Sequence, residues 1–289
     1  MGIIEAIILG IIQGLAEFLP ISSSGHLALA KAFFGFENGS IAFDVFLHLG
    51  TLIAVFAVFY KDIFELIKEF FGIVVDIISN IITFFKPKKG KKKEYRKIVG
   101  TPYRRFAMLV IVSTIPTGIL GVLMKDMVEK ASGTLIVPGI CLLVTAVMLF
   151  VSDMLKDGNK NENNTSWLSA IFVGVCQGVA TMPGISRSGT TITAGLVCGM
   201  KRDFVVKYSF LMSIPAILGA VVLEIPDMKA DLAKTPAMSY VVGVVVSAVV
   251  GYICIKAMLV IVKKKKFKYF SYYCAAMGLI AVIGSFFIK

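Results

Sequence analysis

Two polar segments interrupt the apolar stretches of this chain, and they share one pattern. The first is QGLAEFLPISSSGH at residues 13–26, and the second, QGVATMPGISRSGT at residues 177–190, aligns with it without a gap. In each, an apolar stretch breaks at a proline, opens into serine and glycine, and resumes as another apolar stretch. The pattern predicts a helix, a polar turn and a second helix. We name the turns the first elbow (residues 20–26) and the second elbow (residues 183–191). We expect the functional residues there, because broken helices in an apolar chain mark binding sites.

Six longer apolar stretches are each long enough to cross the bilayer as a helix, since about 20 apolar residues cover about 30 Å of hydrocarbon. They lie at about residues 43–60, 106–124, 134–152, 205–224, 238–262 and 270–288. The stretches beside the elbows are too short or too broken to cross singly. They predict two re-entrant hairpins, over residues 3–36 and 167–200, that enter the bilayer and return to the same side. The predicted fold is all-α: a polytopic membrane protein with six transmembrane helices and two re-entrant helical hairpins.

The hairpins divide one integral-membrane domain, residues 1–289, into two repeats. Residues 1–153 and 166–289 each hold one hairpin followed by three crossings. An odd number of crossings turns the second repeat upside down relative to the first, so the halves are predicted to form an inverted repeat. The first repeat also has an insertion at residues 61–105. Polar residues recur at helical steps in its leading part, which predicts an amphipathic helix lying on the cytoplasmic surface.

Composition and charge exclude most other classes of protein. A hydrophobic content of 57% and a mean hydropathy of +0.85 exclude an ordinary soluble domain. Much of the net charge of +12 lies in basic runs at residues 86–105 and 263–268, beside the ends of predicted spans. Such runs are topology signals that place these loops in the cytoplasm, and we expect no nucleic-acid partner. The five cysteines are scattered in apolar segments and predict neither a disulfide framework nor a metal site.

The residue types in the elbows describe an anion-binding site. If the hairpins enter from opposite faces, the elbows meet near the middle of the bilayer. Serine and glycine at a helix start leave backbone N–H groups unpaired, with the positive end of the helix dipole behind them. Arg187 adds a permanent charge and a fork of donors that matches phosphate oxygens. We therefore expect a phosphate or diphosphate ligand. The residues expected to surround it are Ser22, Ser23, Ser24, Gly25, His26, Ser186, Arg187, Ser188, Gly189, Thr190 and Thr191.

Other polar residues near the first elbow indicate catalysis. Gln13 and Glu17 are one helical turn apart, and His26 follows Ser22 and Ser23 at helical spacing, so either hydroxyl is expected beside the imidazole. A serine beside a histidine is an activated nucleophile, and a histidine that titrates near neutrality handles the proton of water or of a leaving group. Glu17 is expected either to hold a divalent cation or to orient His26. We expect His48, between two leucines, to be structural, and Lys207 to snorkel from the end of its span.

At these residues the chain resembles the BacA/UppP family of undecaprenyl-diphosphate phosphatases, membrane enzymes linked to bacitracin resistance. The resemblance covers nearly the whole length and includes both elbow segments, Phe43-Asp44-Val45 with Leu49-Gly50-Thr51, and Ser209-Phe210-Leu211 with Ser213-Ile214-Pro215. It implies hydrolysis of undecaprenyl diphosphate to undecaprenyl phosphate and phosphate, which recycles the carrier lipid of cell-wall synthesis. It also implies a divalent cation, Mg²⁺ or Ca²⁺, and a location in the bacterial cell membrane with the active site facing the extracytoplasmic side.

Carried over residue by residue, the resemblance implies a set of catalytic residues: Glu17, Ser23, His26 and Arg187. It implies further residues around them: Gln13, Ser22, Ser186 and Thr191. The family pattern accepts Glu or Gln at the position of Gln13, so Glu17 is the only carboxylate in this copy of the pattern and the expected ligand of the cation. The substrate's own oxygens would complete the coordination.

Several alternatives stay open from the sequence. A transporter or flippase of a polyprenyl phosphate would use the same anion site, because inverted repeats with broken helices are a recurrent transporter plan. Such a carrier needs the arginine and the amides but no acid–base pair, so Glu17 and His26 discriminate the two functions. The sequence does not decide between attack by a covalent serine and direct attack by water, or between a monomer and a homodimer. It also leaves open the preferred cation, the prenyl chain length and the side of the membrane to which the cavity opens.

Overall fold

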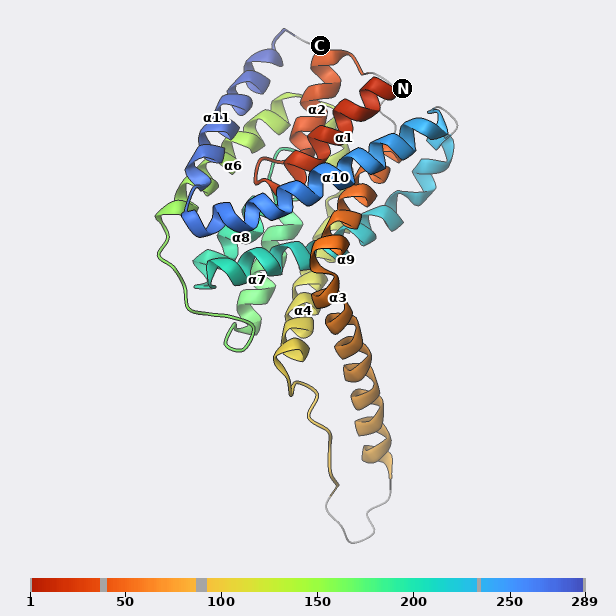
Figure 1. Ribbon diagram of the computed structural model, residues 1–289, viewed down its shortest axis with the longest axis vertical. Coiled ribbons are helices and arrows are strands. Elements are labelled where there is room, and N and C mark those ends of the chain that lie inside the picture. Colours follow the sequence, from red (N-terminus) through yellow and green to blue (C-terminus); the bar gives the residue numbers. More distant parts are fainter. Residues whose placement is uncertain (1, 37–40, 87–92, 233–234, 288–289) are drawn as a thin grey trace.

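The computed structural model describes residues 2–36, 41–86, 93–232 and 235–287 (Figure 1). Its regular elements in these ranges are helices, and β pairing there is confined to an isolated bridge between Lys160 and Met200. In chain order they are α1 (Ile3–Phe18), α2 (Ser23–Phe34), α3 (Ile41–Phe85), α4 (Pro102–Leu123), α5 (Lys125–Ser132), α6 (Ile136–Met154), α7 (Trp167–Val179), α8 (Arg187–Val197), α9 (Arg202–Asp231), α10 (Ala237–Ile261), the 3₁₀ helix η2 (Val262–Lys264) and α11 (Phe267–Gly284).

Six of the described helices are long and apolar enough to cross a membrane. They are Ile41–Phe85, Pro102–Leu123, Ile136–Met154, Arg202–Pro226, Ala237–Lys264 and Phe267–Gly284. These bounds contain or closely match the predicted stretches, so the all-α fold with six transmembrane helices is confirmed. The chain is a multi-pass membrane protein.

The helices beside the elbows are short. With 16, 12, 13 and 11 residues, α1, α2, α7 and α8 are each about 16–24 Å long, less than the roughly 30 Å of hydrocarbon. α1 packs against α2, and α7 packs against α8. Serine caps begin the second helix of each pair: Ser22 Oγ accepts from the Gly25 amide at 3.3 Å, and Ser186 Oγ accepts from the Gly189 amide at 3.1 Å. The predicted helix–turn–helix pairs are therefore present, and their re-entrant path stays a prediction.

Each short pair leans on a long helix of the other half. α1 packs against α10, and α7 packs against α4. Glycines permit both close crossings: a methyl group at Gly14 would lie 2.7 Å from Val250 Cβ, and one at Gly178 would lie 2.6 Å from Leu120 Cβ. The remaining long helices pair as α3 with α9 and as α6 with α11. This reciprocal packing is what an inverted repeat requires, and the inverted orientation itself stays a prediction.

The insertion begins as a continuation of the preceding span. α3 runs through 45 residues, with non-helical backbone angles at Phe59, and its second part projects beyond the helical bundle (Figure 1). A helix is therefore present in the leading part of the insertion, joined to the span, and its amphipathic place on the cytoplasmic surface stays a prediction. Its polar face pairs with the returning chain, where Arg104 contacts both Glu69, at 2.7 Å, and Asp76, at 2.6 Å. Residues 87–92 of the first basic run lie outside the described residues.

Lys207 does not snorkel as expected. Its Nζ lies 2.6 Å from Asp62 Oδ1, and the Tyr103 hydroxyl donates to the same oxygen at 2.9 Å. Because the lysine comes from α9 and the aspartate from α3, this ion pair ties the base of the projecting helix to the bundle. This charged residue near a span end therefore has an ion-pair partner within the chain. A single sequence does not reveal such a pairing.

Candidate active site

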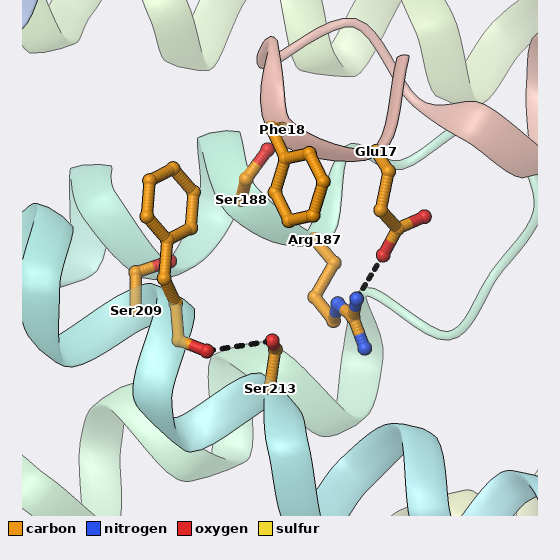
Figure 2. A pocket seen from close by; sticks show the side chains of 7 residues that line it. Glu17, Phe18, Arg187, Ser188, Ser209 and Ser213 are labelled. Atoms are coloured by element: carbon orange, nitrogen blue, oxygen red, sulfur yellow. Dashed lines mark hydrogen bonds and ion pairs between the residues drawn. The ribbon is translucent and has the colours of Figure 1, made fainter. Parts of the chain in front are cut away.

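The two elbows meet at Gly25 and Gly184, as predicted, and Glu17, which lies just before the first elbow, pairs with the second elbow. This carboxylate ends α1 and is almost fully buried, with 4% of its side chain exposed. Its Oε1 forms an ion pair with Nη2 of Arg187, the first residue of α8, although 170 residues separate the two (Figure 2). Arg187 is less buried, at 22% exposure. A buried charge is stable only when it is paired, so the pair connects both halves of the chain at the site.

The second carboxylate oxygen of Glu17 has three further neighbours. Ser23 Oγ donates to Oε2 at 2.6 Å, Gln13 Nε2 donates to it at 3.0 Å, and His48 Nε2 lies 3.7 Å away. The predicted association of Gln13 with Glu17 is therefore present. Ser23 points to the carboxylate, so Glu17 is placed to accept the proton of the Ser23 hydroxyl.

The backbones of the elbows touch where both residues are glycine. A methyl group at Gly25 would lie 2.9 Å from Gly184 Cα, closer than real side chains come. Gly184 has a φ of +93°, in the region that favours glycine. Ser22 has a φ of +72° without being glycine, and strain of this kind is common at functional sites. The first elbow is thus held in a conformation that local propensity alone would not choose.

The start of each short helix supplies part of the predicted anion cradle. The cap serines use the amides of Gly25 and Gly189, which are therefore already bonded. The first-turn amides of Ser24 and Ser188 have no acceptor within their own helices. Side-chain hydroxyls lie beside them, with Ser24 Oγ 3.4 Å from Ser22 Oγ and Ser188 Oγ 3.4 Å from Ser186 Oγ. Both helix starts therefore offer donors beside the ion pair.

His26 does not contact a serine hydroxyl as expected. Its Nδ1 lies 2.8 Å from the Ser22 carbonyl oxygen, one turn earlier in the chain, and its Nε2 lies 2.9 Å from the Tyr273 hydroxyl. The rings of His26 and Tyr273 are stacked, with centroids 5.4 Å apart and an interplanar angle of 10°. The expected serine–histidine pair is therefore replaced by two others: Ser23 with Glu17, and His26 with Tyr273 of α11.

His48, which we expected to be structural, lies beside Glu17 in the site. Its Nδ1 donates to the Asp44 carbonyl oxygen at 2.8 Å, because a carbonyl only accepts, and this turns Nε2 toward Glu17. The sequence placed His48 on an apolar crossing helix but did not say which helix it faces. The only sequence signal for this orientation is that His48 lies one helical turn after Asp44.

Two residues of the second elbow region support the site from beneath. Ser186 and Thr191 are buried; the Ser186 amide donates to Thr145 Oγ1 at 3.0 Å, and Thr191 Oγ1 lies 2.6 Å from Ser209 Oγ. These contacts fix the turn that carries Arg187. Ser186 and Thr191 were predicted to surround the ligand; they do not line the pocket described below, and their role at the ligand stays a prediction.

A small pocket opens beside the ion pair (Figure 2). Its lining residues come from α1, α8 and α9: Glu17, Phe18, Arg187, Ser188, Ser209, Phe210 and Ser213. The α9 members were not predicted as site residues, although the segments that contain them resemble family segments. No residue of the first elbow is among these lining residues. The first elbow is linked to the pocket indirectly, because Ser23 donates to Glu17. Phe18 and Phe210, in edge-to-face contact at 5.5 Å, give the pocket an apolar wall.

The chemistry of the nearby oxygens suits a hard divalent cation. Gln13 Oε1 is buried and has no hydrogen-bond partner, and it belongs to the side chain that already contacts Glu17. Carboxylate, amide and hydroxyl oxygens are the ligands of Mg²⁺ and Ca²⁺. No group of three or more His, Cys, Asp or Glu residues gathers in the described part of the chain. Glu17 and Gln13 therefore fit such an ion only if other oxygens complete its coordination.

Comparison with known proteins gives close relatives over almost the whole chain. A family model described as bacitracin resistance protein BacA matches residues 6–280. The chain is 44% identical over 284 residues to an undecaprenyl-diphosphatase of Methanosphaera stadtmanae, which covers 98% of each sequence. It is 43% identical over 286 residues to an undecaprenyl-diphosphatase of Methanobrevibacter smithii, covering 99% of this chain and 98% of the relative. An undecaprenyl-diphosphatase of Alkaliphilus metalliredigens is 40% identical over 283 residues, covering 97% of this chain and 98% of the relative. The matched region includes both elbows.

Proposed function

This chain belongs to the BacA family, and on that premise we propose that it is an undecaprenyl-diphosphatase. It hydrolyses undecaprenyl diphosphate, releasing undecaprenyl phosphate and inorganic phosphate. The observation that carries this proposal is the ion pair between Glu17 and Arg187, which places a proton acceptor and an anion-binding group from opposite halves of the chain beside one pocket. The lipid monophosphate then returns to cell-wall synthesis as a carrier.

Substrate binding begins at Arg187. The guanidinium is partly exposed and lies beside Ser188 at the start of α8, so the helix dipole and first-turn amides add to its attraction for a diphosphate. A bound diphosphate competes with Glu17 for the guanidinium. This competition releases the carboxylate oxygen that the arginine holds, which strengthens Glu17 as a base when substrate is present.

The chemical step uses Glu17 as the proton acceptor. The attacking group is either Ser23 Oγ, already 2.6 Å from Glu17 Oε2, or a water held beside it. As its oxygen bonds to the terminal phosphorus, its proton passes to Glu17 and the bond to the bridging oxygen breaks. Arg187 and the amides stabilise the negative charge on the transferred phosphoryl group. With Ser23 as nucleophile, a water then hydrolyses the phosphoserine, and His26 is the candidate base for that proton.

Glu17 and Gln13 are the residues that would hold a divalent cation. When bound, Mg²⁺ or Ca²⁺ would neutralise charge on the phosphate oxygens. Gln13 would contribute a neutral amide oxygen to the cation. A second carboxylate at this position would bind the cation more tightly. Occupancy is therefore expected to depend on the oxygens of the substrate.

We place the protein in the plasma membrane, with the site open to the extracytoplasmic side. The basic runs at residues 86–105 and 263–268 support this orientation, since loops rich in lysine and arginine stay in the cytoplasm. The apolar surfaces between the long helices would hold the prenyl tail. Because the tail leaves lipid rather than water, chain length contributes little to affinity.

The experiment is a phosphate-release assay with purified protein in detergent. Wild-type protein is expected to release one phosphate per undecaprenyl diphosphate, and Glu17→Gln is expected to lower the rate of release about 10²- to 10⁴-fold. Glu5→Gln is the matched control, because Glu5 lies on the same helix and bonds only near the N-terminus, to the Gly2 amide. A wild-type protein that binds the diphosphate but releases no phosphate would overturn the proposal and favour a carrier.

A further inference from the structure

Tyr273 links the last helix of the chain to the first elbow. It lies on α11, and its hydroxyl is 2.9 Å from Nε2 of His26, 247 residues earlier in the sequence. The two rings are also stacked, 5.4 Å apart at 10°. A hydrogen bond together with a parallel stack fixes both the position and the rotation of the imidazole. The functions described above leave this contact unexplained.

The hydrogen bonds around His26 determine where its proton lies. Nδ1 is 2.8 Å from the carbonyl oxygen of Ser22, and a carbonyl only accepts, so Nδ1 carries a hydrogen. In the neutral imidazole Nε2 is then an acceptor, and the Tyr273 hydroxyl donates to it. The hydroxyl oxygen keeps its own lone pairs for another donor. The Ser22 carbonyl therefore sets the tautomer of His26, and Tyr273 connects Nε2 to the partly exposed surface of α11.

α11 is held firmly enough to position the ring. Ser271 Oγ donates to the Ala146 carbonyl oxygen of α6 at 2.6 Å. The two helices cross closely, since a methyl group at Gly278 would lie 2.9 Å from the Gly139 carbonyl oxygen. Beside Tyr273, the buried Cys274 sulfur is 3.8 Å from the carbonyl oxygen of Pro20 in the first elbow. The Tyr273 hydroxyl therefore comes from a helix that is held by α6 and by the first elbow.

We infer that Tyr273 serves the reaction through His26: its ring and hydroxyl orient the imidazole, whose hydrogen on Nδ1 is set by the Ser22 carbonyl, and its hydroxyl passes a proton to Nε2. This inference rests on the proposed function, in which His26 handles the proton of water. Because the Tyr273 hydroxyl occupies Nε2, the hydroxyl gives its own proton to Nε2 and accepts the proton of water in its place. Removing the hydroxyl leaves the stacked ring in place but frees Nε2. The loss of one net hydrogen bond then lowers kcat about two- to tenfold with KM unchanged, because the proposed function assigns substrate binding to Arg187.

The test combines a spectrum and an assay on Tyr273→Phe. Tyr272→Phe is the matched control, because Tyr272 is the neighbouring residue on the same helix and is 59% exposed, against 42% for Tyr273. The chain has two histidines, so ¹⁵N-histidine labelling in a His48→Gln background reports on His26 alone. The spectrum is expected to show a protonated Nδ1 and an unprotonated Nε2, and Tyr273→Phe is expected to shift the Nε2 signal while Tyr272→Phe does not. In the assay, with His48 intact, only Tyr273→Phe should lower kcat, and it should cost nothing further in a His26→Ala background.

Different results overturn different claims. If wild-type protein turns over and the Nε2 signal is the same in Tyr273→Phe and Tyr272→Phe, the inference fails while the proposed function stands. A shifted signal with unchanged kcat also overturns it, because the contact would then be structural. An equal loss of kcat with and without His26 would show that Tyr273 acts elsewhere. Absence of phosphate release by the wild type overturns the proposed function, and this inference with it.

Discussion

The Glu17 carboxylate and the Arg187 guanidinium form an ion pair between the two halves of this chain. Each belongs to a helix too short to cross a bilayer alone. Each charge stabilises the charged form of the other in an apolar interior. The pair brings a residue just before the first elbow into contact with a residue of the second elbow. In the proposed mechanism, substrate competes with Glu17 for the arginine, which couples binding to activation of the base.

Replacing Glu17 by Gln removes the proton acceptor and leaves Arg187 unpaired. Phosphate release is expected to fall about 10²- to 10⁴-fold, the usual contribution of a positioned acid–base group. Diphosphate binding is expected to stay or improve, since the competing carboxylate is gone. Steady-state kinetics together with equilibrium binding of a non-hydrolysable diphosphate separate these effects. Retained turnover in Glu17→Gln would contradict the role of Glu17 as the proton acceptor.

The contact between Gly25 and Gly184 leaves no space for a methyl group. Gly25→Ala would bring its Cβ to 2.9 Å from Gly184 Cα, so the elbows must separate. We expect a loss of about 1–3 kcal/mol in stability and reduced activity. Thermal unfolding in detergent measures the first and phosphate release the second. Gly118→Ala is the control, because a methyl group there meets nothing within 4 Å inside α4; equal behaviour of the two variants would argue against close elbows.

Much of this fold could be predicted from local features of the sequence. The six long helices follow from the length of their apolar runs, and the turns at residues 20–26 and 183–191 follow from proline, serine and glycine. Arg187 and Glu17 were identified because charges are expensive in a membrane. These predictions depend on composition and local chemistry, which a sequence displays directly.

The contacts that were not predicted depend on how each helix is rotated. Ser22 with its positive φ turns the first elbow so that Ser23 meets Glu17 and His26 meets Tyr273. His48 faces Glu17 because of the packing of α3, and no periodicity encodes that direction. Rotation about a helix axis is set by tertiary packing, so the partners of His26 and His48 become visible only in the structure.

Gln13→Glu is expected to strengthen binding of the divalent cation. The substitution replaces a buried, unpartnered amide oxygen by a second carboxylate near Glu17. The concentration of Ca²⁺ or Mg²⁺ that restores half of the activity after EDTA treatment should therefore fall. Gln177→Glu makes the same change at the matching position beside Thr117 and should leave that concentration unchanged. An identical cation requirement in wild-type protein and Gln13→Glu would contradict the cation site.

Asp157 gives the fold an acid-sensitive component. It lies between α6 and α7, where hydrogen bonds from Arg202 and then Lys265 hold its pKa below the usual value of 3.8. A carboxyl whose pKa is lower in the folded state contributes stability above its unfolded pKa, and this contribution is lost as the pH falls through the folded pKa. Asp157→Asn should therefore lower the unfolding temperature at neutral pH but not in acid. A difference independent of pH would show that the ion pairs with Asp157 do not stabilise the fold.

The central claim is that both elbows hold one diphosphate headgroup, and an experimental structure with a non-hydrolysable polyprenyl diphosphate analogue tests it most directly. The terminal phosphate is expected within hydrogen-bond distance of Arg187 and of the first turns of both α2 and α8, with Glu17 separated from the guanidinium. A headgroup bound away from Arg187, or in contact with one elbow only, would contradict the account.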